Sequence, residues 1–583
     1  MPGIVGLITR MPRQRAEQEL LHMVEALRHE DFYVAGTWID ESLGVYVGWV
    51  ARKGSFAEGM PLCNESGDVT LVFSGEEFPE PSTAQQLRKR GHDVDSSGPS
   101  YLVHLYEDDE SFPVGLNGRF HGLLADRNQG KAVLFNDRYG MHRLYYHESR
   151  DAFYFAAEAK AILAVNASLK EKAAYFHPRE WESQEKLQPE AYYQALREAF
   201  SRNLPRYFGG DQRIGMSLTG GLDTRMIAAW QKSAPGDLPC YTFGSMVRDN
   251  HDVRVARRVA KACNQPFQVL PVGEEFLARF PYYAERAVYL TDGCVDVGRA
   301  PDLYLNEKAR EIAPVRMTGN YGGEILRGLR AFKPEDRVPG LFSPEFLGHV
   351  HRVKETYDGL TQGHPASFAA FKQCPWHHYG ILALEQTQLS LRSPYVDNEL
   401  VRTVFRAPDS ALANDGVSLR LISDGNPALA RIPTDRGVGG KRNRLVGKAS
   451  RALLEFQFMA EYAYDMGMPQ WVARIDHAFS PLHLERLFLG RHKVFHFRVW
   501  YRDALASYVK ETLLDPRSLS RPYLERNGLE AIVRGHLKGD QNYTNELHKV
   551  LTLELVHRIF LENQGRSGER RVPETPLTAA QVT

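Results

Sequence analysis

The residues best suited to chemistry stand in the stretch Ser217–Arg225, "SLTGGLDTR". A short apolar run precedes it, and residues 226–230 read as the start of a helix. Strand, glycine turn and helix in this order point backbone N–H groups and a helix N-terminus at an anion. The P-loop lysine of Gly-x-x-x-x-Gly-Lys-Ser/Thr is missing, and Asp223 stands in the loop instead. The pattern favours phosphate binding without a lysine, but a plain turn with Asp223 as helix cap also explains it.

Three other places carry ionisable side chains of interest. The segment Arg431–Arg444 combines glycines with several cations, which suits either a mobile charge-stabilising loop or a solvated basic one. Asp249 and Asp252 precede an expected helix and fit a capping role. Trp376-His377-His378 lacks further metal-ligand spacing, so we interpret it as surface or core filler.

Bulk composition narrows the class of protein. A chain of 583 residues exceeds a single core, so two or more domains are expected. Acidic and basic residues number 72 each, and this balance argues against nucleic-acid or membrane-surface binding. The five cysteines include no Cys-x-x-Cys pair, and neither a bilayer-length apolar run nor a signal peptide is found. We expect a cytoplasmic protein.

The elements that must position these residues change character along the chain. Residues 1–165 are predicted to form mostly strands with two helices, an α+β pattern. From about residue 190 strands and helices alternate, which predicts a parallel sheet followed by helices. The expected helices are 17–27, 101–106, 223 onward, 252–263 and 544–563, and the expected strands include 71–74, 132–135, 214–218, 241–243, 267–270 and 315–318. The polar stretch 565–583 is expected to be disordered.

Several blocks, taken in order, resemble the glutamine-dependent asparagine synthetase family. The "TGGLDT" loop is similar to the Ser-Gly-Gly-x-Asp-Ser loop of the family's ATP-pyrophosphatase domain. The other blocks that carry the resemblance are residues 116–120 "LNGRF", 136–146 "NDRYGMHRLYY", 157–163 "AEAKAIL", 392–397 "RSPYVD" and the closing helices from 535 "GHLKGDQNYTNELHKVLTLELVHRIFLEN". The family includes β-lactam synthetases and lasso-peptide cyclases besides asparagine synthetases.

The resemblance implies a fold and a domain division. It implies an α+β Ntn-hydrolase-like sandwich followed by an α/β PP-loop domain with a parallel sheet and a helical C-terminal part. We therefore expect an amidotransferase-like domain over 1–165, a synthetase domain over 190–564 and a tail over 565–583.

The resemblance also implies the chemistry of the glycine loop. In the family a carboxylate attacks the α-phosphorus of ATP, pyrophosphate leaves, and an amine then displaces AMP from the acyl-adenylate. ATP and Mg²⁺ are thus the implied cofactors. The residues implied to bind nucleotide are Leu218, Thr219, Gly220, Gly221, Asp223, Thr224, Phe243, Thr318 and Gly319, with Asp223 also a magnesium ligand.

The amidotransferase half departs from the family at four places. The family's nucleophilic cysteine is Pro2 here, and its Asn-Gly-Glu is Ser74-Gly75-Glu76. Its glutamine-binding aspartate falls on Gly98, and residues 48–52 stand where it has Arg-Leu-Ser. Loss of a nucleophile alone can cost about 10⁶ in rate, so we predict no glutaminase activity. Pro2 would offer a secondary amine as base if it were N-terminal; a proline simply beginning a strand is the other interpretation.

The synthetase half departs as well. The family's second pyrophosphate motif aligns with residues 318–324, and its second magnesium aspartate becomes Gly323 while Glu324 is retained as a candidate ligand. The family's catalytic acidic or tyrosyl residue falls on Asn320, and a further glutamate falls on Ser390. Tyr321 could relay a proton or simply pack in the core.

Lys441 is the first choice for the charge-stabilising cation that the family carries in the segment 431–444, and Arg436 is the second. With Tyr321 they complete the candidate catalytic residues.

The sequence therefore predicts an AMP-forming, ATP-dependent carbon–nitrogen ligase that joins a small-molecule or peptide carboxylate to an amine. The amine would be free ammonia, a donated amine or an amine of the same substrate. The alternative is a non-catalytic homologue that binds nucleotide or a partner. A tRNA-modifying PP-loop enzyme fits the zero net charge poorly. A homodimer is left open, and neither nucleic acid nor membrane is expected as a partner.

Overall fold

The computed structural model describes residues 1–94, 98–109, 111–163, 165, 175–331, 340–412, 414–440, 444–479, 485 and 489–562. The expected tail over 565–583 and Lys441 lie outside the described residues. Within them, no helix has both the length and the apolar character needed to cross a bilayer.

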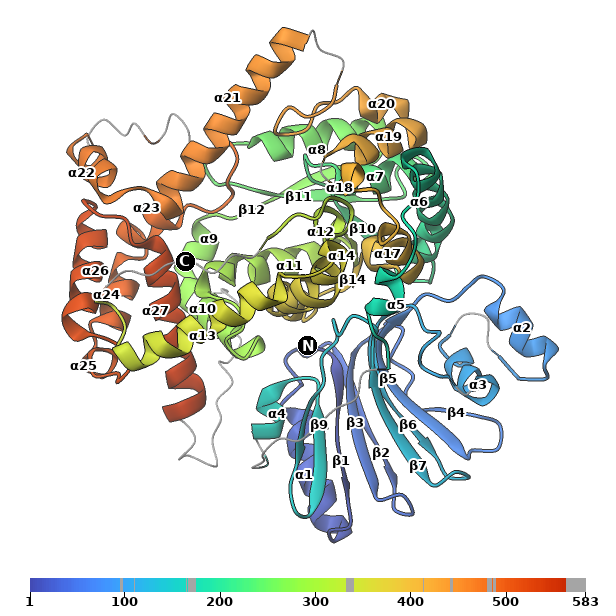
Figure 1. The fold of residues 1–583 in the computed structure, drawn as a ribbon. Coiled ribbons are helices and arrows are strands. Elements are labelled where there is room, and N and C mark those ends of the chain that lie inside the picture. The colour runs from blue at the N-terminus through green and yellow to red at the C-terminus, as the bar shows by residue number, and fades with distance from the viewer. Residues whose placement is uncertain are drawn as a thin grey trace, which may run out of the picture.

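The N-terminal part is a sandwich of two antiparallel sheets, seen at the lower right of Figure 1. Its buried side chains, among them Ile4, Trp49, Phe73 and Phe120, fill the space between the sheets. In spatial order the first sheet holds β2 (Tyr33–Asp40), β3 (Val45–Arg52), β1 (Gly3–Thr9), β9 (Ala152–Ala156) and β8 (Tyr145–Glu148), and the second holds β4 (Leu62–Cys63), β5 (Val69–Glu77), β6 (Gly118–Asp126) and β7 (Lys131–Asn136).

Helices cover the outside of this sandwich. α1 (Arg13–Glu25) buries Leu20 and Met23 against the outer face of the β1 sheet, and α4 (Ala159–Leu163) packs beside it. α2 (Thr83–Lys89) and α3 (Tyr101–Asp108) lie at the edge near β4. The predicted helices 17–27 and 101–106 correspond to α1 and α3, whereas α2 and α4 were not predicted.

The second part is built on a parallel sheet, as the sequence predicts. The spatial order is β12 (Phe267–Pro271), β11 (Cys240–Gly244), β10 (Ile214–Ser217), β13 (Val315–Met317) and β14 (Ser390–Arg392). Successive strands run outward from β10 to β12 on one side, and the chain then returns to place β13 on the other side of β10. The order therefore reverses between β10 and β13, and in open parallel sheets ligands bind at such a reversal, beyond the carboxyl ends of the strands.

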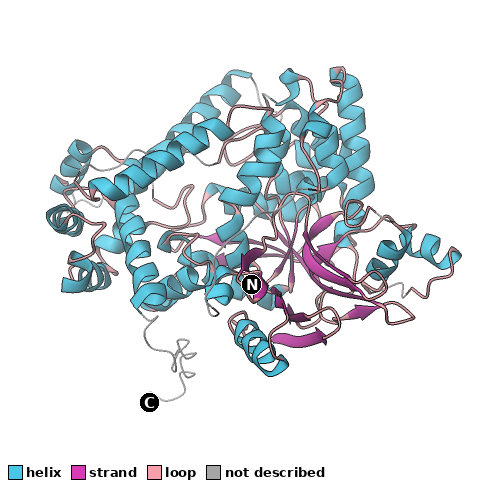
Figure 2. Cartoon of the chain, turned by 60° about the horizontal axis from the view of Figure 1, so that its bottom comes forward, coloured by secondary structure: helices cyan, strands magenta, loops and turns pink. Residues whose placement is uncertain are grey.

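Helices cover both faces of this sheet. The second part is therefore rich in helices, whereas the N-terminal sandwich is rich in strands (Figure 2). One buried cluster joins the sheet to α6 (Pro189–Asn203), α7 (Asp223–Trp230), α8 (His251–Ala262), α17 (Asn398–Val404) and α19 (Gly416–Gly425). A second joins it to α10 (Phe280–Leu290), α11 (Ala300–Ile312), α23 (Phe497–Arg502), α24 (Ala506–Leu513), α26 (Arg526–Lys538) and α27 (Thr544–Val556). The remaining helices are α5 (Arg179–Glu182), α9 (Glu274–Ala278), α12 (Gly322–Arg327), α13 (Pro344–Leu360), α14 (Pro365–Phe368), α15 (Cys374–His377), α16 (Tyr379–Glu385), α18 (Asp409–Leu412), α20 (Pro427–Ala430), α21 (Arg444–Tyr462), α22 (Gln470–Ala478) and α25 (Pro516–Leu519). The closing helix was expected to run to residue 563; α27 ends at Val556, and a π-helical turn, His557–Leu561, follows it.

Candidate active site

The loop after β10 turns tightly into α7. The backbone N–H of Thr219 donates to the hydroxyl of Thr224 at 3.1 Å, and the two threonine hydroxyls also lie 3.1 Å apart. Leu222 occupies the N-cap position and Asp223 is the first helical residue, so Asp223 does not cap the helix. The turn is held by its own threonines, which leaves the carboxylate of Asp223 for another contact.

Gly220 is enclosed by acidic residues from two other segments. Its N–H donates to Asp252 Oδ1 at 2.5 Å, and its carbonyl accepts from Arg225 Nη2 at 3.0 Å. A Cβ at Gly220 would meet Asp435 Cβ at 2.8 Å and Asp252 Oδ1 at 3.1 Å. Only glycine fits here. Its N–H already donates to a carboxylate oxygen, and a phosphate oxygen could accept the same hydrogen bond.

Asp252 therefore does more than precede a helix. Asn250, not Asp252, caps α8, since its side chain accepts from the N–H of Val253 at 2.8 Å. Burial, together with the charge of Asp435, raises the pKa of Asp252 to about 7. Sequence reasoning did not single out Asp435, although it directly precedes Arg436 in the glycine-rich segment.

Arg327 holds the carboxylate of Asp223. Its Nη1 and Nη2 donate to Oδ1 and Oδ2 at 2.8 and 3.0 Å, and the two side chains are 11% and 24% exposed. Burial raises the pKa of Asp223, and the charge of Arg327 opposes that rise. Both oxygens of the predicted magnesium ligand are thus engaged by a guanidinium.

The same guanidinium lies beside Gly323, where the family pattern places a second aspartate. A Cβ at Gly323 would stand 3.2 Å from Arg327 Nη2. The family's second aspartate is therefore absent at the point where the guanidinium of Arg327 lies. Sequence reasoning missed Arg327, although it follows Gly323 by four residues, one turn along α12.

The retained acid of this motif also has a partner. Glu324 Oε1 lies 2.8 Å from His378 Nε2. Burial acts to raise the pKa of Glu324, but the hydrogen bond and charge of His378 hold it below the usual value. His378, interpreted from sequence as filler, is thus the partner of a predicted metal ligand.

The candidate adenine and ribose residues converge at one edge of the parallel sheet. Leu218, Phe243 and Thr318 directly follow or end the neighbouring strands β10, β11 and β13. Leu218 and Thr318 are buried, and Phe243 is half-buried with the guanidinium of Arg316 5.2 Å from its ring centre. A Cβ at Gly319 would meet the backbone N of Thr224 at 2.7 Å, which places the two loops in contact across the reversal.

The candidate catalytic residues are placed unequally. Tyr321 has a left-handed backbone with φ of 74°, its ring is buried against His378 at 5.1 Å, and burial raises its pKa. Its phenol therefore stays protonated near neutral pH and gives up its proton less readily than a free phenol. Arg436 is exposed, with its guanidinium stacked 3.8 Å from the ring centre of Phe458.

Three of the four altered stretches of the amidotransferase half line one cavity, and Gly98 does not. Pro2, Arg52, Ser74 and Glu76 are among the residues that line it. Three of the four altered stretches thus meet in space, next to Gln386 and Ser390 of the synthetase half.

Contacts with the synthetase half lie beside this cavity. Arg392 Nη2 lies 2.9 Å from Glu76 Oε1, and its Nη1 donates to the carbonyls of Tyr207 and Gly209 at 3.1 and 2.7 Å. Arg52 Nη2 donates to Ser390 Oγ at 2.7 Å. Arg52 and Glu76, at positions where the family pattern places glutamine-site residues, here contact the synthetase half.

Comparison with known proteins finds two family models that match the chain. A glutamine amidotransferase domain model matches residues 1–198, and an asparagine synthase model matches residues 192–379. Together they span more than half of the chain.

Individual relatives agree with these models. Asparagine synthetase [glutamine-hydrolyzing] 1 of Bacillus subtilis is 23% identical over 409 residues, which are 60% of this chain and 63% of the relative. Asparagine synthetase 2 of the same organism is 22% identical over 507 residues, 70% of this chain and 67% of the relative. The match thus spans less than two thirds of the first of these relatives. Among solved structures, the glutamine phosphoribosylpyrophosphate amidotransferase of B. subtilis matches with 13% identity and a TM-score of 0.25, covering 48% of this chain and 67% of that chain.

Proposed function

Because the chain belongs to the asparagine synthetase family, with an amidotransferase domain followed by a synthetase domain, we propose that it is an ATP-dependent, AMP-forming ligase. A carboxylate oxygen of the substrate attacks the α-phosphorus of ATP, and the bond to pyrophosphate breaks. An amine then attacks the activated carbonyl, AMP leaves, and the amine loses a proton. The product is an amide.

One observation supports this proposal most. The glycine loop and the loop 318–324 lie in contact at the reversal of strand order, where parallel sheets bind their ligands. The N-terminus of α7 and the N–H of Gly220 face this region with partial positive charge. A triphosphate that displaces the carboxylate of Asp252 from Gly220 would receive the same hydrogen bond.

The described residues do not fit a magnesium ion held by the protein. Arg327 engages both oxygens of Asp223, His378 engages Glu324, and Gly323 offers no ligand atom. We therefore assign Mg²⁺ only as the counter-ion that enters with ATP. Arg327 supplies a fixed positive charge beside the glycine loop, where the departing pyrophosphate gathers negative charge.

The amine is proposed to come from outside the amidotransferase domain. Pro2 provides no side-chain nucleophile, and Arg52 and Glu76 beside it are engaged by Ser390 and Arg392. Steady release of glutamate from glutamine by the pure protein would contradict this assignment.

A second candidate function rests on the same ion pair. If Arg327 stays on Asp223 when nucleotide binds, the loop can hold ATP without activating it. The protein would then be a binding module, the non-catalytic alternative raised by the sequence.

The two functions differ in their products. The protein is incubated with MgATP and pooled carboxylates and amines, and the ligase predicts carboxylate-dependent AMP and pyrophosphate in equal amounts. ADP would indicate a different mechanism. ATP binding without turnover in any pool would favour the binding module.

Two variants test the residues of the site. Arg327→Met is expected to lower turnover about 100-fold or more, the effect of removing one preorganised charge. Asp223→Asn is expected to lower turnover as well, because the carboxylate that holds Arg327 in place is lost. Asp409→Asn is the matched control, because its carboxylate is 91% exposed and pairs only with Lys186 at 2.7 Å in the described chain. Turnover of Arg327→Met equal to that of the control would remove Arg327 from the mechanism. Circular dichroism checks that each variant is folded.

A further inference from the structure

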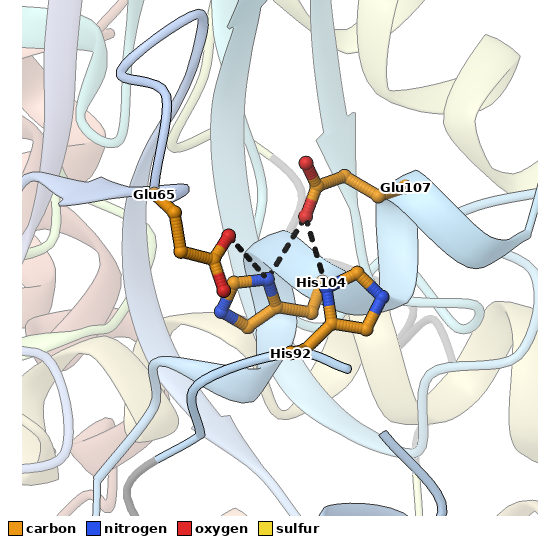
Figure 3. Close-up of side chains that lie close together, drawn as sticks. All are labelled: Glu65, His92, His104 and Glu107. Carbon is orange, nitrogen blue, oxygen red and sulfur yellow. Dashed lines mark hydrogen bonds and ion pairs between the residues drawn. The ribbon is translucent and has the colours of Figure 1, made fainter. Parts of the chain in front are cut away.

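Four side chains with metal-binding atoms converge at the edge of the N-terminal domain (Figure 3). Glu65 comes from the turn between β4 and β5, and His92 from the segment between α2 and α3. His104 and Glu107 stand one turn apart on α3, so they share a face of that helix. The cluster shares no residue with the glycine loop or the cavity beside Pro2.

The distances within the cluster are those of a small coordination sphere. His104 Nδ1 lies 2.8 Å from Glu107 Oε2 and 3.7 Å from Glu65 Oε2, and His92 Nδ1 lies 3.6 Å from Glu107 Oε2. One donor atom from each of the four residues falls within 4.8 Å of every other. Tetrahedral zinc with bonds near 2.0–2.1 Å places its donors about 3.3 Å apart. The separations of 2.8, 3.6 and 3.7 Å lie on both sides of that spacing.

Further hydrogen bonds turn the correct atoms inward. The other oxygen of Glu107, Oε1, accepts from Asn64 Nδ2 at 2.7 Å, and Glu65 Oε1 accepts from the N–H of Asp93 at 2.9 Å. His92 Nε2 lies 3.3 Å from Asp108 Oδ1. These hydrogen bonds engage the outer atoms of both carboxylates and of the His92 imidazole. Oε2 of each glutamate and Nδ1 of His92 then face the centre of the cluster. Metal sites in proteins use the same outer contacts to fix ligand orientation.

We infer that Glu65, His92, His104 and Glu107 form a structural binding site for a divalent transition metal of the zinc class. Two imidazole nitrogens and two carboxylate oxygens are donors that Zn²⁺ accepts. Four protein ligands complete a tetrahedron and leave no open position for catalysis. The metal would tie α3 and the segment before it to the β4–β5 turn.

Burial is consistent with a site that is shielded yet reachable. The side chain of His104 is 4% exposed, whereas that of Glu65 is 50% exposed. The ion would enter past Glu65 and displace the hydrogen bond between His104 and Glu107.

Metal binding to the full chain tests this inference without reference to ligase activity. Tag-free protein is dialysed against a chelator and titrated with ZnCl₂ in a calorimeter, and with CoCl₂ in a spectrophotometer. We expect one equivalent of Zn²⁺ to bind and to raise the Tm, and Co²⁺ to give the visible absorption of tetrahedral coordination. Glu65→Gln and His104→Asn are each expected to weaken Zn²⁺ binding at least tenfold.

His349→Asn is the matched control, since this exposed histidine lies on α13 outside the cluster. Glu65→Gln changes a half-exposed turn residue, so it tests the site even if His104→Asn fails to fold. Absence of stoichiometric Zn²⁺ binding by the wild type would overturn the inference. Binding that is equal in Glu65→Gln and the control, or tighter binding of Ca²⁺ or Mg²⁺ than of Zn²⁺, would overturn it as well.

Discussion

The carboxyl group of Asp252 is a partly buried acid that stays partly protonated near neutral pH. Burial and Asp435 raise its pKa in the folded chain from 3.8 to about 7. Between these values the folded state binds a proton that the unfolded chain has lost. The stability contributed by this proton is therefore complete below pH 4 and declines as the pH rises to 7, by an amount on the order of 2–4 kcal/mol.

Replacement of Asp252 by asparagine should remove this pH dependence. The amide oxygen still accepts from the N–H of Gly220 but carries no charge to desolvate. We expect the Tm of Asp252→Asn minus that of the wild type to be a few degrees larger at pH 8 than at pH 5. Thermal melts at both pH values measure the difference.

Asp249→Asn serves as the control in these melts, because its side chain is 45% exposed and pairs with Arg257 at 2.8 Å. It should follow the wild-type pH dependence. If Asp252→Asn also follows the wild-type pH dependence, protonation of Asp252 does not contribute to the free energy of unfolding as proposed.

At the scale of elements, the turn between β10 and α7 depends on one hydroxyl. Thr224 Oγ1 accepts from the N–H of Thr219, and Thr224 is 3% exposed. Thr224→Val keeps the shape but leaves that N–H without its acceptor, at a cost of about 1–3 kcal/mol. We expect ATP affinity to fall about tenfold or more, because the loop no longer holds its form.

Thr224→Ser retains the hydroxyl and should keep ATP affinity close to that of the wild type. Isothermal titration with ATP measures both variants. Equal affinity in the valine and serine variants would show that the turn holds without this hydrogen bond.

The elements that follow from local signals were predictable, and contacts between distant segments were not. An apolar run, two glycines and a helix-forming stretch define β10, the turn and α7 without help from the rest of the chain. α2 was missed because, in the stretch "TAQQLRK", only Leu87 is buried, so its apolar periodicity is weak. The ion pair of Arg327 with Asp223 spans 104 positions and exists only once β10 and β13 are neighbours.

The candidate site was likewise predicted only in part. The four altered amidotransferase positions came from the resemblance, and Pro2, Arg52 and Ser74 line one cavity, whereas Gly98 does not. The spacing of Glu65, His92, His104 and Glu107 matches no metal motif, because a turn and two separate segments bring them together. Lys441 lies outside the described residues, and its role stays a prediction.

At the scale of the whole molecule, a buried ion pair joins the two halves. The side chains of Arg392 and Glu76 are 8% and 12% exposed. Arg392→Met leaves Glu76 buried without its cation and removes donors from two backbone carbonyls, so we expect a loss of about 3–5 kcal/mol. Chemical denaturation measures the loss, and limited proteolysis should show faster cleavage between the halves.

Arg420→Met provides the comparison, because Arg420 and Glu190 form an exposed pair with side chains 44% and 64% exposed. Its expected cost is within about 1 kcal/mol. An Arg392→Met variant as stable as Arg420→Met would mean that the interface holds without this pair.

The position of β14 at the end of the parallel sheet has a consequence for how the chain can be divided. Arg52 and Glu76 of the sandwich reach residues Ser390 and Arg392 of this outermost strand. A fragment that begins near residue 190 would lose these contacts at the edge strand β14, and uncovered edge strands recruit other chains. The contacts of the sandwich with β14 would then help to keep the synthetase half from self-association.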